Sequence, residues 1–291
     1  RRSRVFSLYM MINLSALALG QVLLMLGDAG AAAMFTITAL LVCAAMLPVT
    51  ATRLQQPDVP NVPRLKLGNL YALAPVATVA AGLSGLAMGP FWGLLPVYAG
   101  EIGLSGDGVP LFMLAAIAGG ALLQWPLGRI SDGHDRRIGL LVVSAVAAAL
   151  AMLAAMPPIQ QQLHIMFLLV FCYGGLVFVL YPFAVAHMLD YLASEDLLSG
   201  CSSLLLVHGV GAAIGPAIAG ALMSRFGAAA LPLYFAFVLA CLAAFTGMRL
   251  LLHARLRTHP APFRAMVRTT PSALELMPET ETPIHPEKET H

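Results

Sequence analysis

Charged residues divide the chain into long uncharged segments. Between Arg4 and Asp28 lie 23 residues without a formal charge, and between Arg137 and Asp190 lie 52. A helix that crosses a bilayer needs about 20 mainly apolar residues, so a short gap holds one helix and the longest holds two. The polar turn at 157–162 separates those two. The pattern predicts eight spanning helices, over residues 5–26, 31–52, 72–98, 109–127, 138–156, 164–189, 197–224 and 228–252.

The type of spanning element follows from the composition of these segments. They are uniformly apolar and rich in Ala and Leu, without the two-residue alternation of a membrane β-barrel. In lipid, every backbone N–H and C=O must be satisfied within the protein, and a helix does this within one segment. We therefore expect an all-α fold, a polytopic membrane helical bundle.

The overall composition excludes most soluble functions. Hydrophobic residues make up 59% of the 291 residues and charged residues 10%, and the mean hydropathy is +0.83. No soluble fold of this size has an interior large enough for so much apolar surface. The sequence contains no Gly-Lys-Ser/Thr phosphate loop, no His/Glu metal cluster and no credible catalytic triad. We expect no enzymatic activity, no cofactor, no metal and no nucleic-acid partner.

Basic residues predict the orientation in the membrane. If eight helices span, 15 of the 16 Lys and Arg residues fall on the side of the two termini, and only Arg225 falls on the other. Cytoplasmic loops carry the excess of Lys and Arg. Both termini of the chain are therefore expected on the cytoplasmic side of the membrane.

The expected organisation has four parts. Residues 1–52 hold two helices, 53–70 form a Pro- and Arg-containing cytoplasmic connector, 71–253 hold six helices, and 254–291 form a cytoplasmic, largely disordered tail. A weak repeat relates the first span to the seventh, because aligning Gly20-Gln21 with Gly215-Pro216 places Asn13 on His208. Chance similarity of two Ala/Gly/Leu-rich helices remains the alternative.

The loop between the fourth and fifth spans carries a family resemblance. It reads Gly128-Arg129-Ile130-Ser131-Asp132-Gly133-His134-Asp135-Arg136-Arg137, and the seventh span contains Gly209, Gly211, Gly215-Pro216 and Gly220. Both segments resemble motifs of the major facilitator superfamily, although Gly133 replaces the usual basic residue and Asp135 the usual Gly. Within it, the chain resembles the YcaD-type group of bacterial transporters. The resemblance implies a twelve-helix fold in two halves, a monomer, and a chain that covers helices five to twelve, with four more helices expected before Arg1.

The resemblance also implies a cytoplasmic gate. Its residues would be Gly128, Asp132, Arg136, Arg137 and Asp190, the acid that ends the sixth span. Carboxylates are attracted to helix N-termini, and arginines can pair with acids at neighbouring helix ends. The alternative is that these charges only set topology, and for Arg137 we favour that interpretation.

Candidate cavity residues are few. His208 lies near the middle of the seventh span, and an ionisable residue there is a functional hypothesis by default. It either binds substrate or a proton, or it hydrogen-bonds a neighbouring helix where Gly211, Gly215, Pro216 and Gly220 allow close packing. The other candidates for the cavity are Asn13, Trp92, Tyr173 and Tyr181.

These observations favour secondary active transport of a small solute by alternating access, with protons as the candidate coupling ion. Two alternatives stay open. One is a non-transporting membrane scaffold, a sensor or an inert truncated transporter. The other is export of a drug or lipid, because mid-membrane charge is scarce.

Overall fold

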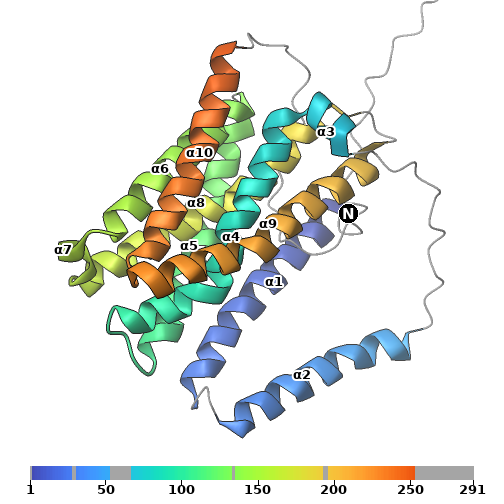
Figure 1. Ribbon diagram of the computed structural model, residues 1–291. Helices are drawn as coiled ribbons and strands as arrows, with labels where there is room; N and C mark the ends of the chain where they lie inside the picture. The colour runs from blue at the N-terminus through green and yellow to red at the C-terminus, as the bar shows by residue number, and fades with distance from the viewer. Residues whose placement is uncertain (1, 28–30, 53–66, 133–134, 193–195, 253–291) are drawn as a thin grey trace, which may run out of the picture.

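The computed structural model describes residues 2–27, 31–52, 67–132, 135–192 and 196–252, with the backbone alone for 2–11 and 130–132. These residues are almost wholly helical and contain no strand, which confirms the expected fold class (Figure 1). The helices are α1 (Arg2–Met25), α2 (Ala32–Ala51), α3 (Leu67–Leu73), α4 (Pro75–Glu101), α5 (Gly108–Asp132), α6 (Arg136–Ala154), α7 (Pro157–Gln160), α8 (Leu163–Leu189), α9 (Leu197–Phe226) and α10 (Ala230–Leu252).

The long helices coincide with the predicted spans to within a few residues. Within the described part of the chain, α2, α4, α5, α6, α8, α9 and α10 are each long and apolar enough to cross a membrane. In α1 the apolar part that is described, Ile12–Met25, is shorter. Seven spanning helices therefore agree with the prediction, and the expected total of eight stays a prediction. The short helix α7 occupies the predicted polar turn.

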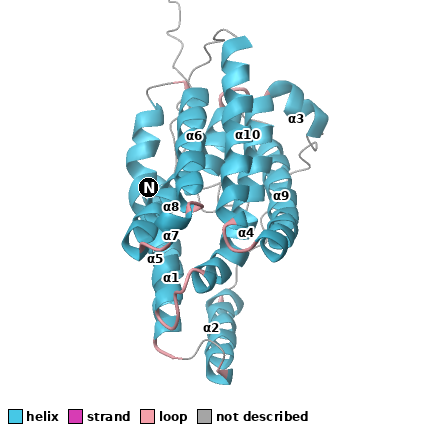
Figure 2. Ribbon diagram, turned by 60° about the vertical axis from the view of Figure 1, so that its left-hand side comes forward, coloured by secondary structure: helices cyan, strands magenta, loops and turns pink. Residues whose placement is uncertain are grey.

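Three helix pairs build the bundle of α4 to α10. The most extensive contacts join α4 to α9, α5 to α8, and α6 to α10, and Figures 1 and 2 both show α6 beside α10. Where α4 and α9 are in contact, the residue numbers of both helices rise in the same direction. The two helices are therefore parallel. Gly247 of α10 lies near Leu141 of α6, and that pair is antiparallel. The starts of α4, α6 and α9 and the ends of α5, α8 and α10 thus share one end of the bundle, which we call the basic end because it carries Arg136, Arg137 and Arg249.

Glycines set the distance between α4 and α9. A Cβ atom on Gly85 would overlap the carbonyl oxygen of His208, and one on Gly215 would lie 2.5 Å from the carbonyl oxygen of Leu86. Side chains at these positions would push the helices apart. Small residues allow the close backbone approach on which helix packing in membranes depends.

The pair of α5 and α8 repeats this arrangement. A Cβ atom on Gly119 would overlap the carbonyl oxygen of Phe171, and one on Gly174 would overlap that of Ala116. Each crossing therefore has glycines on both helices. The α4–α9 crossing joins the first helix of the group α4–α6 to the second helix of the group α8–α10. The α5–α8 crossing joins the second helix of α4–α6 to the first helix of α8–α10.

The first two helices lie differently. α1 packs against α5, whereas α2 has no buried residue and stands apart from the bundle in Figure 1. Large apolar side chains are also exposed on the outside of the bundle, such as Phe237 at 69%. An apolar surface of this extent requires a lipid or protein environment rather than water.

Candidate functional site

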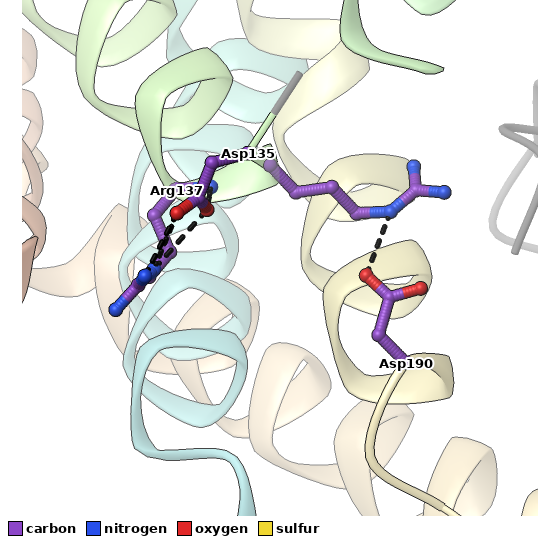
Figure 3. Close-up of polar contacts among 4 residues, drawn as sticks. Asp135, Arg137 and Asp190 are labelled. Carbon is purple, nitrogen blue, oxygen red and sulfur yellow. Dashed lines mark hydrogen bonds and ion pairs between the residues drawn. The ribbon is translucent and has the colours of Figure 1, made fainter. Parts of the chain in front are cut away.

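A buried ion pair joins two helix ends at the basic end of the bundle. Nε of Arg136, the first residue of α6, donates a hydrogen bond of 2.9 Å to Oδ2 of Asp190, which follows the last residue of α8 (Figure 3). The two side chains are 2% and 11% exposed. Both were assigned to the gate from sequence, and the fold brings them together across 54 positions of the chain.

Arg137 has a different partner from its neighbour. Its Nη2 lies 2.7 Å from Oδ2 of Asp135, and Nε donates to both carboxylate oxygens, at 3.1 and 3.2 Å. Asp135 also accepts the backbone N–H of Arg137 at 3.0 Å, so its side chain caps the N-terminus of α6. In Figure 3 Arg137 turns back toward Asp135, while Asp190 lies on the other side of the helix start.

Two predicted gate residues lie on α5. Gly128 is buried near the end of that helix. Asp132 is its last residue, and the side chain of Asp132 lies outside the described residues. The expected contact of Asp132 with a neighbouring helix N-terminus therefore stays a prediction.

The electrostatics at the basic end reflect partial burial. Burial raises the pKa of Asp135, but the hydrogen bonds from the side chain and backbone of Arg137 outweigh it, and the pKa falls below its ordinary value of 3.8. Burial raises the pKa of Tyr191, which lies just beyond α8. The ring of Tyr191 packs edge-on against buried His187, with centroids 5.1 Å apart. His187 and Tyr191 thus pack against each other at the end of α8.

His208 lies in a buried polar contact between helices. Its side chain is 2% exposed, and Nδ1 lies 3.0 Å from Oγ of Ser84 and 3.1 Å from the carbonyl oxygen of Ala81, both on α4. Because a carbonyl oxygen only accepts, the hydrogen bond to Ala81 requires the proton on Nδ1. The ring of Tyr181, from α8, lies 4.7 Å from the imidazole. Three helices therefore meet at His208.

Aromatic rings connect the other cavity candidates. The ring of Trp92 stacks on Phe178 at 5.8 Å, and Phe91 lies between this pair and Tyr173. Tyr173 is buried, and its hydroxyl has no hydrogen-bond partner among the described residues. Trp92 is half-buried. Tyr173 and Tyr181 lie eight residues apart on α8, which is about 12 Å along the helix. The aromatic cluster around Tyr173 and the His208 contact of Tyr181 therefore lie at two different depths along α8.

The remaining predicted residues occupy separate places. Asn13 is half-buried on α1, whose most extensive packing is against α5. Gly211 and Gly215 lie buried in the α4–α9 crossing. Pro216 lies 2.9 Å from a Cβ placed on Gly89, and Gly220 has more room, with Leu94 as its nearest neighbour at 3.8 Å.

Several residues of the site and of the helix crossings were not identified from the sequence. Ser84 is an ordinary hydroxyl in an apolar helix, and nothing local marks it as the partner of His208. Gly85 and Gly89 carried a detectable signal, because their four-residue spacing is that of the small-residue packing motif. Asp135 was noted only as a departure from the loop motif, although an Asp just before a helix is a recognisable N-cap.

Together, the apolar helices, the glycine crossings and the ion pairs at one end define a multi-pass α-helical membrane protein. The family model for the Major Facilitator Superfamily matches residues 77–282. The match covers more than half of the chain, and the chain belongs to this superfamily. The assignment confirms the resemblance seen in the motif loop.

The chain is also similar to curated relatives from Escherichia coli. It is 28% identical over 231 residues to the "Uncharacterized MFS-type transporter YcaD" of strain O9:H4 (HS), and equally to those of strains K12/DH10B and O157:H7 EC4115. The alignment covers 77% of this chain and 58% of each relative. The chain thus spans less than two thirds of the length of the relatives it matches. No solved structure matches it.

Proposed function

We propose that the protein is a secondary active transporter that moves a small solute across the bacterial inner membrane by alternating access. The observation that carries the proposal is the buried Arg136–Asp190 pair in a chain of the major facilitator superfamily. A buried pair is stable only in one geometry, because separating the partners leaves a charge without compensation. The intact pair therefore stabilises one conformation, and breaking the pair allows the protein to adopt another.

The proposed gate consists of two linked ion pairs. Arg136 joins the start of α6 to the end of α8, and Arg137 with Asp135 fixes the start of α6. Motion of α8 relative to α6 therefore strains the first pair while the second keeps α6 capped. Gly128 and Asp132, at the end of α5, complete the proposed gate.

The proposed substrate region lies around His208, Trp92, Tyr173 and Tyr181. The hydroxyl of Tyr173 is buried without a partner among the described residues, and such a group costs free energy until water or a ligand satisfies it. His208 is the candidate proton site, because histidine is the residue type whose unperturbed side chain changes charge near neutral pH. A solute with few charges fits this region, since the described side chains there are mostly aromatic.

The proposed arrangement has two helical groups. Residues 1–52 belong to one group and 71–253 form the six-helix group. The proposed cytoplasmic connector, 53–70, lies outside the described residues except for 67–70, and so does the proposed tail, 254–291. The exposed surface of α2 supports this, because a helix without buried residues needs a further partner or lipid. Basic residues are in excess at the helix ends that lie on the same side of the bundle as Arg136. This excess supports a cytoplasmic location for the basic end.

Two serines on α9 provide a direct test of alternating access. Ser202 and Ser224 are both exposed and lie 22 residues apart, which is about 33 Å along the helix and nearly the same face. We would replace the four cysteines by serine or alanine, introduce Ser202→Cys or Ser224→Cys, and measure alkylation by a membrane-impermeant maleimide in vesicles of each orientation.

Asp190→Asn is expected to raise labelling at Ser202→Cys and lower it at Ser224→Cys. Opposite changes at the two ends are what alternation between two states requires. Labelling that rises at both ends would mean a loosened bundle, and unchanged labelling would mean that the pair sets topology only. Either result would favour the scaffold alternative over transport.

A further inference from the structure

Pro90 leaves one backbone carbonyl of α4 without its helical partner. In an α-helix the N–H of each residue donates to the carbonyl four positions earlier, and proline has no N–H. Pro90 lies inside α4, so the carbonyl of Leu86 receives no hydrogen bond from position 90. In lipid such a carbonyl needs another donor from within the protein, because no water is present to supply one.

A tyrosine from another helix supplies this donor. The hydroxyl of Tyr234, near the start of α10, donates a hydrogen bond of 3.1 Å to the carbonyl oxygen of Leu86. The two residues are 148 positions apart in the chain, and Tyr234 is buried. Tyr234 therefore returns to α4 the hydrogen bond that Pro90 removes.

Close packing against α9 encloses the same carbonyl. A Cβ atom on Gly215 would lie 2.5 Å from the carbonyl oxygen of Leu86 and 2.8 Å from Cδ of Pro90. Gly215 and Pro90 are both buried. The Cα–H of a glycine is only a weak donor, so this contact does not replace the missing N–H. The hydroxyl of Tyr234 is a full hydrogen-bond donor at this place.

The residue after Tyr234 contacts the aromatic cluster. The ring of Phe235 lies 5.3 Å from that of Tyr173 on α8. On α4, the ring of Phe91 stacks on Tyr173 at 6.5 Å and meets Trp92 edge-on at 5.1 Å. Two adjacent residues of α10 therefore hold the backbone of α4 and pack against the rings that follow it.

We propose that Tyr234 is a positioning residue, which fixes the direction of the second half of α4 and thereby the places of Phe91 and Trp92. Helices bend mainly at proline, and the hydroxyl holds α4 at the turn where Pro90 permits bending. The link to a substrate region rests on the proposed function, whereas the hydrogen bond and its effect on α4 do not. Tyr234 itself does not need to touch the solute.

A double-mutant cycle with Pro90 tests the hydrogen bond in the full chain in detergent. Tyr234→Phe removes only the hydroxyl, and we expect it to lower the melting temperature by about 2–4 °C, the shift for one hydrogen bond in a domain of about this size. Pro90→Ala and Pro90→Gly each give position 90 an N–H that can reach the carbonyl of Leu86. In both of these backgrounds Tyr234→Phe should leave the melting temperature unchanged.

Tyr98→Phe is the matched control. The hydroxyl of Tyr98 also donates to a backbone carbonyl, that of Ala154, at 3.2 Å. Tyr98 lies eight residues beyond Pro90, about 12 Å along α4, a distance at which substitutions usually act independently. Tyr98→Phe should therefore lower the melting temperature equally with proline, alanine or glycine at position 90.

Tryptophan fluorescence tests the positioning role. The chain has two tryptophans, so Trp125→Phe leaves Trp92 as the only one. Trp125 is 66% exposed, and phenylalanine keeps an aromatic ring there. We expect Tyr234→Phe to raise the quenching of Trp92 by acrylamide, because loss of the hydrogen bond lets the second half of α4 move. This rise should vanish in the Pro90→Ala and Pro90→Gly backgrounds.

The outcomes separate the parts of the proposal. An equal loss of stability from Tyr234→Phe in all three backgrounds, or no loss in any, would overturn the link between Tyr234 and the carbonyl freed by Pro90. Coupled stabilities with unchanged quenching of Trp92 would overturn the positioning role. None of these measurements requires transport, so their failure would leave the proposed function standing, and an absence of transport would leave the role of Tyr234 in α4 standing.

Discussion

Nε of Arg136 donates to Oδ2 of Asp190 over 2.9 Å, and this contact joins the first residue of α6 to the residue that follows α8. Arg137, the next residue, instead pairs with Asp135 only two positions away. The two adjacent arginines therefore have different structural roles. The first connects two helices that are distant in the sequence, and the second stabilises the start of its own helix.

The first prediction concerns the stability of the connecting pair. Asp190→Asn should reduce the free energy of unfolding by about 3 kcal/mol, because removal of one partner leaves a buried guanidinium without its counter-charge. Thermal or denaturant unfolding in detergent would measure it. The double variant with Arg136→Gln should lose less than the sum of the single variants. Asp107→Asn, in an exposed loop, is the matched control. Strict additivity would show that the pair contributes no coupling.

The second prediction concerns the pH dependence of the helix cap. Since the pKa of Asp135 is lowered in the folded protein, its contribution is fully present above the ordinary value of 3.8 and is lost as the pH falls below it. Asp135→Asn keeps a capping oxygen but removes the charge. Wild type should therefore be more stable than Asp135→Asn at pH 7, and the difference should shrink below pH 3.8. Melting temperatures at several pH values would measure it. A difference that is constant with pH would contradict the ion pair with Arg137.

Asp135→Ala separates capping from charge. It should be less stable than Asp135→Asn by about 1 kcal/mol, the usual value of a lost N-cap. This further loss should persist at low pH, because an uncharged carboxyl or amide still accepts the backbone N–H of Arg137.

The third prediction compares two glycines of α4. Gly85→Ala should destabilise the bundle by about 1–3 kcal/mol, because its Cβ would overlap the carbonyl oxygen of His208. Gly93→Ala has open space around it and should stabilise by up to about 1 kcal/mol, since Ala is the better helix former. The same substitution in the same helix thus has opposite expected signs. Equal melting temperatures would mean that α4 and α9 do not cross as closely as described.

The fourth prediction concerns His208 and rests on the proposed proton coupling. A charged imidazolium at a position with 2% exposure lacks hydration, so acid should favour the conformation in which His208 meets water. The ratio of labelling at Ser202→Cys and Ser224→Cys should therefore change between pH 8 and pH 5. His208→Gln should abolish the change, whereas His164→Gln, on an exposed position of α8, should retain it. A pH response that survives His208→Gln would make His208 a packing residue.

Much of the fold could be predicted from sequence because a spanning helix is a local property. About 20 apolar residues between charges are sufficient in lipid, whatever surrounds them, and the predicted spans agree with the helices to within a few residues. The ends of those spans also supplied Arg136 and Asp190, since charges in a membrane protein gather where helices leave the bilayer. The motif in the loop between the fourth and fifth predicted spans indicated the superfamily.

Only the tertiary structure decided which of these residues meet. Asp190 and Asp135 are both plausible partners for either arginine by charge, and the packing of α6 beside α8 assigns one to each. The same holds for Ser84 with His208 and for Gly85 and Gly89 against α9, because the rotation and spacing of two helices depend on close backbone contact along their whole length. Composition fixes whether a helix enters the membrane, but complementary surfaces distant in the chain determine its neighbours.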